Sequence, residues 1–273
     1  MSNLNRALGA ARVADYQSSA YAALYLDRMQ PVLQAESVAG GGATGYLLTN
    51  ETGRHLALWM SFEDIIRVAD LKTRASRFAR VRDEARARDD EPVVITDYLK
   101  PGLEELASLL PPALGRRLIA WAQRTGRLRA WNVGMHIQTS SVLGFVLVRS
   151  IAWLKPWRPM SFRFAAEQAH IEDWLARIRE AARRDLRLAL EIAACAGLIK
   201  GYGDTHRLGM ANFLALMDAL IDNPVSADPL AQAGALASAR AAALADPEGR
   251  ALAKNLGRPP MGGKPVVWLS KAN

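Results

Sequence analysis

Apolar residues recur every three or four positions along most of the chain, and glycine and proline mark the breaks between these segments. This spacing places the apolar side chains on one face of a helix, so it predicts a mainly α-helical fold. A first helix is expected over residues 5–29 and should end at Pro31, because proline disrupts a helix interior. A long helix is expected from an N-cap at Thr49, with a bend or interruption near residues 70–73.

The rest of the chain predicts further helices, each bounded by turn or capping residues. They are expected over residues 101–110, 114–125, 140–154, 161–183, 185–200 and 205–221, with one or two more in 235–256. The longest apolar run, residues 142–154, is shorter than the roughly 20 residues that span a bilayer. This run is therefore predicted to be a buried core helix.

Two short segments have extended character instead, residues 91–99 and 131–139, and they are predicted to pair as a two-stranded ribbon. The expected fold is thus a single, mainly α domain over residues 1–273 with at most this ribbon. A core of 5–222 would be followed by an alanine-rich helical extension over 226–273. The large side chains expected in the hydrophobic core are Trp59, Leu106, Trp121, Phe145, Trp174, Leu190 and Phe213.

The charge of the chain raises the question of anionic partners, since the formal net charge is +8 and the isoelectric point is near 9.9. Acidic residues are interleaved with the basic ones, as in the i,i+4 pair of Asp70 and Arg74, which is typical of solvated helix faces. This distribution argues against nucleic acid as a partner. A basic helical adaptor for nucleic acid or for an acidic protein remains the alternative interpretation. The N-terminal sequence lacks the pattern of a secretory signal, so a cytoplasmic protein with no membrane segment is expected.

Catalytic and metal-binding motifs are scarce in the sequence. The sole cysteine, Cys195, lies in an apolar run, which excludes an internal disulfide or a thiolate cage and predicts a buried structural thiol. The sequence contains no Gly-x-Ser-x-Gly motif and no recognisable nucleophile and base arrangement, so no catalytic residue and no metal ligand is assigned. A stand-alone enzyme would need a pocket that no motif discloses.

The stretch LIKGYGDTHR, residues 198–207, holds the densest group of candidate site residues. One interpretation is a helix corner, in which Gly201 and Gly203 adopt positive φ and Asp204 caps the next helix. The sharper interpretation is an anion or partner site at the amide-rich start of that helix. The residues that would form such a site are Lys200, Tyr202, Asp204, His206 and Arg207.

A second polar group comprises Glu51, Arg54 and His55. The i,i+4 spacing of Glu51 and His55 resembles half of a helical metal site, but no second ligand pair is close in sequence. A hydrogen-bonded structural histidine is therefore favoured. The adjacent acids Glu63 and Asp64 point to different sides of a helix and are interpreted as surface or interhelix ion-pair residues.

Several long strings of the sequence resemble one known family. They are VADYQSSAYAALYLDRM, ETGRHLALWMSFEDIIRVADLKTRASRFARVR, DYLKPGLEELASLLPPALGRRLIAWA, RPMSFRFAAEQAHIEDWL and LALEIAACAGLIKGYGDTHRLGMANF. Across residues 13–213 they resemble the C-terminal helical domain of the beta-type subunit of indolepyruvate oxidoreductase, in the indolepyruvate ferredoxin oxidoreductase family.

The resemblance implies a role in a complex that oxidatively decarboxylates an aryl 2-oxoacid to an acyl-CoA. In that family thiamine diphosphate and iron–sulfur clusters belong to the alpha-type subunit, and a glycine-rich α/β domain precedes the helical domain. The expected partners are that thiamine-dependent subunit and that α/β domain, and this chain itself is expected to bind no cofactor. No catalytic motif of the family falls on a residue of this chain, so the implied role is docking or stabilisation of the complex.

Overall fold

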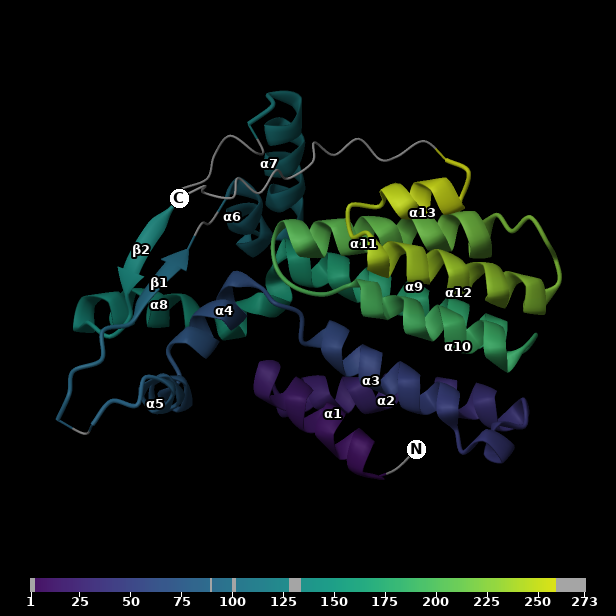
Figure 1. The fold of residues 1–273 in the computed structure, drawn as a ribbon, viewed down its shortest axis with the longest axis horizontal. Coiled ribbons are helices and arrows are strands. Elements are labelled where there is room, and N and C mark those ends of the chain that lie inside the picture. The colour runs from purple at the N-terminus through teal and green to yellow at the C-terminus, as the bar shows by residue number, and fades with distance from the viewer. Residues whose placement is uncertain (1–2, 89, 100–101, 128–133, 259–273) are drawn as a thin grey trace. The chain divides into compact units, whose positions relative to one another are not determined.

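The computed structural model describes residues 3–88, 90–99, 102–127 and 134–258. Within these ranges the chain forms thirteen α-helices and one two-stranded antiparallel sheet (Figure 1), which confirms the prediction of a mainly α fold with a small ribbon. Of the expected C-terminal extension, residues 259–273 lie outside the described ranges.

The helices pack as two compact units, each assembled from separate stretches of the chain. Unit 1 comprises Met1–Ala14, Ser19–Met60 and Ile171–Asn273, and unit 2 comprises Asp15–Ser18 and Ser61–His170. The division concerns packing within the chain and does not test independent folding, so one domain over residues 1–273 stays a prediction.

Unit 1 is built around α3, which packs against α2 on one side and α10 on another, while α10 also packs against α12 (Figure 1). Trp59 of α3 lies against Trp174 and Phe213, with ring centroids 5.5 and 5.3 Å apart, so these three predicted core residues are confirmed. The helices of this unit are most of α1 (Asn3–Tyr16), α2 (Ser19–Val38), α3 (Leu47–Met60), most of α9 (Phe162–Ala182), α10 (Leu186–Cys195), α11 (Asp204–Met217), α12 (Pro229–Ala245) and α13 (Arg250–Asn255).

The prediction of the first helix was wrong both in its continuity over residues 5–29 and in its end at Pro31. The chain breaks after Tyr16, and α2 then continues through Pro31 to Val38. A proline in a helix interior costs about 3 kcal/mol. Buried apolar side chains lie on both sides of it, among them Tyr25 and Val32, and each contributes roughly 1.5–3 kcal/mol. Tertiary burial therefore outweighs the local cost of the proline.

The long helix predicted from Thr49 is three helices, α3, α4 (Ile65–Lys72) and α5 (Ala75–Glu84). The predicted interruption near residues 70–73 is confirmed by the end of α4. Thr49 is not an N-cap, because α3 begins at Leu47 and its first amides are satisfied from elsewhere. The buried carboxylate of Glu36 accepts hydrogen bonds from the amides of Leu48 and Thr49 at 2.9 and 2.7 Å, and from the Thr49 hydroxyl.

Unit 2 combines the ribbon with short helices. Strand β1 (Thr96–Leu99) pairs antiparallel with β2 (Met135–Gln138), so the predicted ribbon is confirmed, although residues 131–133 lie outside the described ranges. A small apolar cluster joins α4 to α8 through Ala69, Val148 and Ala152. The remaining elements are α6 (Leu103–Leu109), α7 (Pro112–Arg124), α8 (Val142–Ala152), the 3-10 helix η2 (Lys155–Met160) and the first residues of α9.

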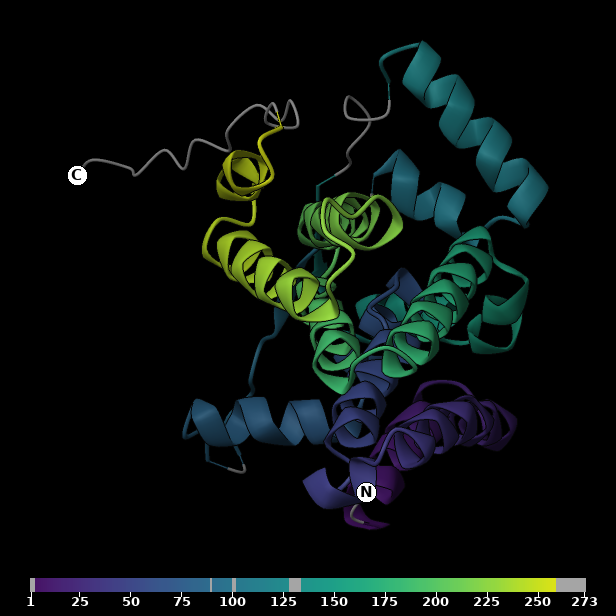
Figure 2. The ribbon, with the colours of Figure 1, turned by 90° about the vertical axis from the view of Figure 1, so that its right-hand side faces the viewer.

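The prediction of a core position is wrong for four residues. Leu106 and Trp121 are exposed, and Phe145 and Leu190 are only half-buried. Helices α6 and α7 form a hairpin, at the upper right of Figure 2. The hairpin packs through small residues, because a Cβ on Gly115 of α7 would come within 3.0 Å of the carbonyl oxygen of Ala107 on α6. The opposite faces of both helices, which carry Leu106 and Trp121, are therefore left uncovered.

Candidate functional site

The stretch 198–207 is a helix corner in unit 1. Helix α10 is followed by the short 3-10 helix η3 (Ala196–Leu198), and α11 begins at Asp204. Gly201 and Gly203 have φ values of 76° and 58°, which confirms the predicted glycine conformations. Thr205 packs on Gly201 so closely that a Cβ there would lie 3.0 Å from its methyl group.

The predicted capping role of Asp204 is wrong. Gly203 is the N-cap of α11, and Asp204 is the first helical residue. Its exposed carboxylate accepts two hydrogen bonds from Arg207, from Nη2 at 3.0 Å and from Nε at 3.2 Å. The cause is a one-residue shift in the corner, because a glycine at positive φ already turns the chain into the helix.

The corner therefore brings together the residues proposed for an anion site, but one of its cations, Arg207, is already paired with Asp204. His206 and Arg207 lie in the first turn of α11, as predicted, while Lys200 is exposed and Tyr202 is half-buried. An anion at this helix start would have to compete with the carboxylate of Asp204 for Arg207. This geometry favours the corner interpretation over the anion site.

The second polar group is organised by His55, which is buried on α3. Arg54 Nη2 lies 2.8 Å from His55 Nε2 and donates to it, and Glu51 Oε2 is 3.7 Å from the same nitrogen. Burial, followed by the charge of Arg54, lowers the pKa of His55 to about 4. The ring is thus neutral at pH 7 and lies against Gly197, three residues before Lys200. These contacts support the predicted structural histidine.

The cysteine lies near this group and behaves as a structural thiol. Cys195 is fully buried, and burial raises the pKa of its thiol to about 12. Among the described residues, no three His, Cys, Asp or Glu side chains are grouped so that they could hold a metal ion.

Unit 2 contains two buried carboxylates whose ion-pair partners could not be predicted from the sequence. Asp64 caps α4 by accepting from the Arg67 amide at 2.6 Å, and it also accepts from Arg158 Nε at 2.7 Å. Arg158 comes from η2 and is almost fully buried, with its guanidinium 4.0 Å above the ring of Tyr16. The ion-pair interpretation of Asp64 is confirmed, but no sequence pattern distinguishes Arg158 from the many exposed arginines.

The second buried carboxylate, Asp97, joins the ribbon to α4 and α5. It accepts from Lys72 Nζ at 2.5 Å, Arg77 Nη2 at 2.9 Å and Thr139 Oγ1 at 2.7 Å. Burial by itself raises the pKa of Asp97, but the hydrogen bonds from Lys72 and Thr139 hold it below its ordinary value. Asp97 is therefore held in its ionised form, and both carboxylates help to hold unit 2 together through their hydrogen bonds to basic side chains.

The most unusual surface of unit 2 is one face of α8, which was predicted to be buried. Val142 and Leu143 are 84% and 82% exposed, and Val146 and Leu147 are about half exposed. The opposite face packs on α4 through Val148 and Ala152, so α8 is covered on one side. The four exposed side chains are called the α8 apolar face below. The prediction of a buried helix was wrong because it rested on a general rule. A helix that is hydrophobic on all faces is normally buried on all faces.

Comparisons with known proteins add one assignment. A family described as "Family of unknown function (DUF6537)" matches residues 6–219. The chain belongs to this family. No curated protein and no solved structure matches the chain. The DUF6537 match begins in α1 and ends in the π-helical turn after α11 (Asp218–Asp222), so it includes the corner, the His55 group and the α8 apolar face. Within the described part of the chain, no helix is both long and apolar enough to cross a membrane.

Proposed function

We propose that this DUF6537 chain is a non-catalytic helical part of an aryl-2-oxoacid oxidoreductase complex of the indolepyruvate type, with a role in docking or in stabilising the complex. Thiamine diphosphate and the iron–sulfur clusters would be held by the alpha-type subunit, and a glycine-rich α/β domain would be the second partner. The complex would operate in the cytoplasm. The five family-like strings support the choice of complex, and the α8 apolar face supports the docking role.

The α8 apolar face carries the docking argument because its side chains form one continuous stripe. Val142 and Val146, and likewise Leu143 and Leu147, are four residues apart and therefore lie one above the other on the helix. Burying each of these side chains against a partner would contribute roughly 1.5–3 kcal/mol. Contiguous apolar surface of this kind is characteristic of protein–protein contact sites.

A co-purification experiment tests the proposal. The tagged full chain is isolated under gentle conditions from a cell that also produces the thiamine-dependent subunit, and that subunit is expected to be recovered with it. Leu147→Glu should reduce the recovery strongly, because a carboxylate in an apolar contact must be desolvated without a partner. Leu230→Glu is the matched control, since Leu230 in the first turn of α12 is 47% exposed and Leu147 is 52% exposed.

The outcomes separate the two parts of the proposal. Recovery of the thiamine-dependent subunit with wild type and Leu230→Glu, but not with Leu147→Glu, supports both parts. Equal recovery with both variants would refute docking through the α8 apolar face. If wild type recovers no thiamine-dependent subunit, the assignment to this complex is wrong.

A basic adaptor remains as the second candidate function because of one feature of α7. This helix contains no acidic residue, and Arg116, Arg117 and Arg124 are all exposed on it. Contacts with phosphates release counterions, so binding to DNA or heparin should weaken steeply as salt is added. Replacing the three arginines with alanine should flatten that salt dependence. An absence of retention on heparin at low salt would rule this function out.

A further inference from the structure

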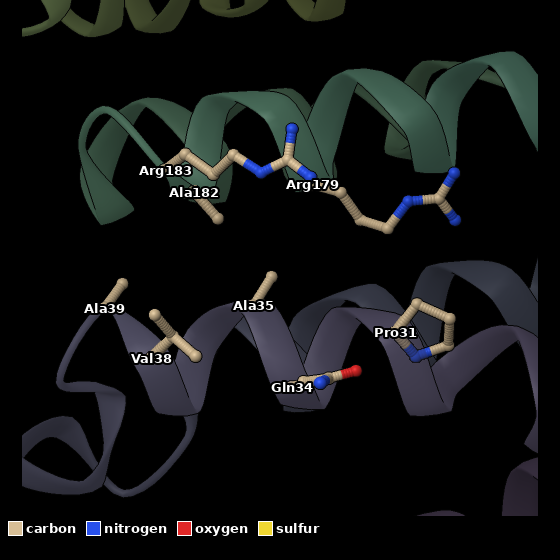
Figure 3. A pocket seen from close by; sticks show the side chains of 8 residues that line it. All are labelled: Pro31, Gln34, Ala35, Val38, Ala39, Arg179, Ala182 and Arg183. Carbon is tan, nitrogen blue, oxygen red and sulfur yellow. The ribbon is translucent and has the colours of Figure 1, made fainter.

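A groove of about 570 Å³ lies in unit 1 between the C-terminal halves of α2 and α9 (Figure 3). Its volume is within the range of roughly 300–1,000 Å³ that is usual for small-molecule sites. Figure 3 shows Ala35 of α2 and Ala39, just after the end of α2, pointing toward α9, and Ala182 pointing back across the groove. The lining residues are Pro31, Gln34, Ala35, Val38, Ala39, Arg179, Ala182 and Arg183.

The two helices that form the groove run in the same direction and are joined at one end. Arg28 of α2 is buried and forms an ion pair with Glu172 of α9, with Nη2 2.7 Å from Oε1. The groove begins one turn beyond this ion pair, at Pro31. Beyond it, Ala35, Ala39 and Ala182 lie across the groove from one another, and their methyl groups leave space between the two segments.

The charges along the groove are unbalanced, because no acid of the two helices is paired with Arg179. Glu36 is turned toward the start of α3, where it accepts from the amide of Leu48, and Glu180 is paired with Arg183 at 2.7 Å. Arg179 has no hydrogen bond and no ion pair with any described residue. A half-buried guanidinium on an apolar floor therefore has unused donors that match a carboxylate.

We propose that the α2–α9 groove binds an amphipathic monocarboxylate, which goes beyond the docking role. The carboxylate accepts hydrogen bonds from Arg179, and Arg183 can leave its exposed partner Glu180 to contribute a second cation. The apolar body of the ligand lies over Ala35 and Ala182, with Pro31 and Val38 at the exposed rim. The groove is open to solvent, and its volume of about 570 Å³ is large enough for a ligand of about ten carbons.

Calorimetric titration of the full chain with decanoate tests this site. One decanoate is expected to bind per chain, and decan-1-ol and acetate should bind much more weakly because each lacks one half of the recognised chemistry. Arg179→Ala should weaken decanoate binding at least about tenfold, as expected for a charge-assisted pair. The matched control is Arg250→Ala on α13, which removes the same charge from an exposed position outside the groove.

A second variant keeps the charge and changes only the space. Ala35→Leu places a larger side chain into the groove, and leucine is compatible with a helix, so binding should weaken while the melting temperature stays close to that of wild type. No decanoate binding to wild type would overturn the proposal. So would unchanged binding in both Arg179→Ala and Ala35→Leu. Loss of binding in Leu147→Glu alone would place decanoate on the α8 apolar face and would also overturn it.

Discussion

Replacement of Arg158 by methionine should be among the most destabilising single changes in unit 2. Arg158 donates to Asp64 Oδ2 at 2.7 Å and Oδ1 at 3.2 Å, and to the Tyr16 carbonyl oxygen at 2.7 Å. The methionine side chain fills most of the same space but leaves the buried carboxylate of Asp64 without its cation. Breaking a buried ion pair from one side typically costs 3–5 kcal/mol. The Arg67 amide still donates to Asp64, so the lower end, about 3 kcal/mol, is expected.

The assay is urea unfolding followed by tryptophan fluorescence and by circular dichroism. Arg158→Met should lower the free energy of unfolding by about 3 kcal/mol at pH 7. The double variant Asp64→Asn with Arg158→Met should recover part of the loss, since no buried charge remains. A loss below about 1 kcal/mol, or no recovery in the double variant, would refute this account of the pair.

Three further predictions concern unit 1. Because the pKa of His55 is lowered to about 4, the unfolded chain binds more protons than the folded chain between pH 6.5 and pH 4. The free energy of unfolding should therefore fall by up to about 3 kcal/mol as the pH is lowered from 6.5 to 4. Thermal unfolding of His55→Gln should lack this effect. Gly203→Ala should lower the free energy of unfolding by about 1–2 kcal/mol, because φ is positive at this position. Asp204→Ala should change the urea midpoint little. A larger loss in Asp204→Ala than in Gly203→Ala would show that Asp204 is the cap after all. Cys195 should react with an aromatic disulfide reagent only after unfolding, and rapid reaction of the native chain would contradict a thiol pKa of about 12.

Local patterns in the sequence determined the class of fold. Helical periodicity predicted helices over residues 185–200 and 140–154, and α10 and α8 begin within two residues of those starts. The extended character of residues 91–99 predicted the ribbon strand. Caps and glycine turns are local in sequence, so the two glycines of the corner could also be predicted. Asp204 was misplaced by one residue because glycine and aspartate both suit a helix start.

The tertiary structure alone decided which side chains are covered. Helix α2 continues through Pro31 because packing on both sides outweighs the proline, and α3 is capped by Glu36 from another helix. Neither effect is visible in a local window, since each depends on residues brought together by the fold. The exposure of the α8 apolar face and the unbalanced charge of Arg179 have the same origin. Apolarity and charge are properties of residues, whereas burial and pairing are properties of the elements that pack around them.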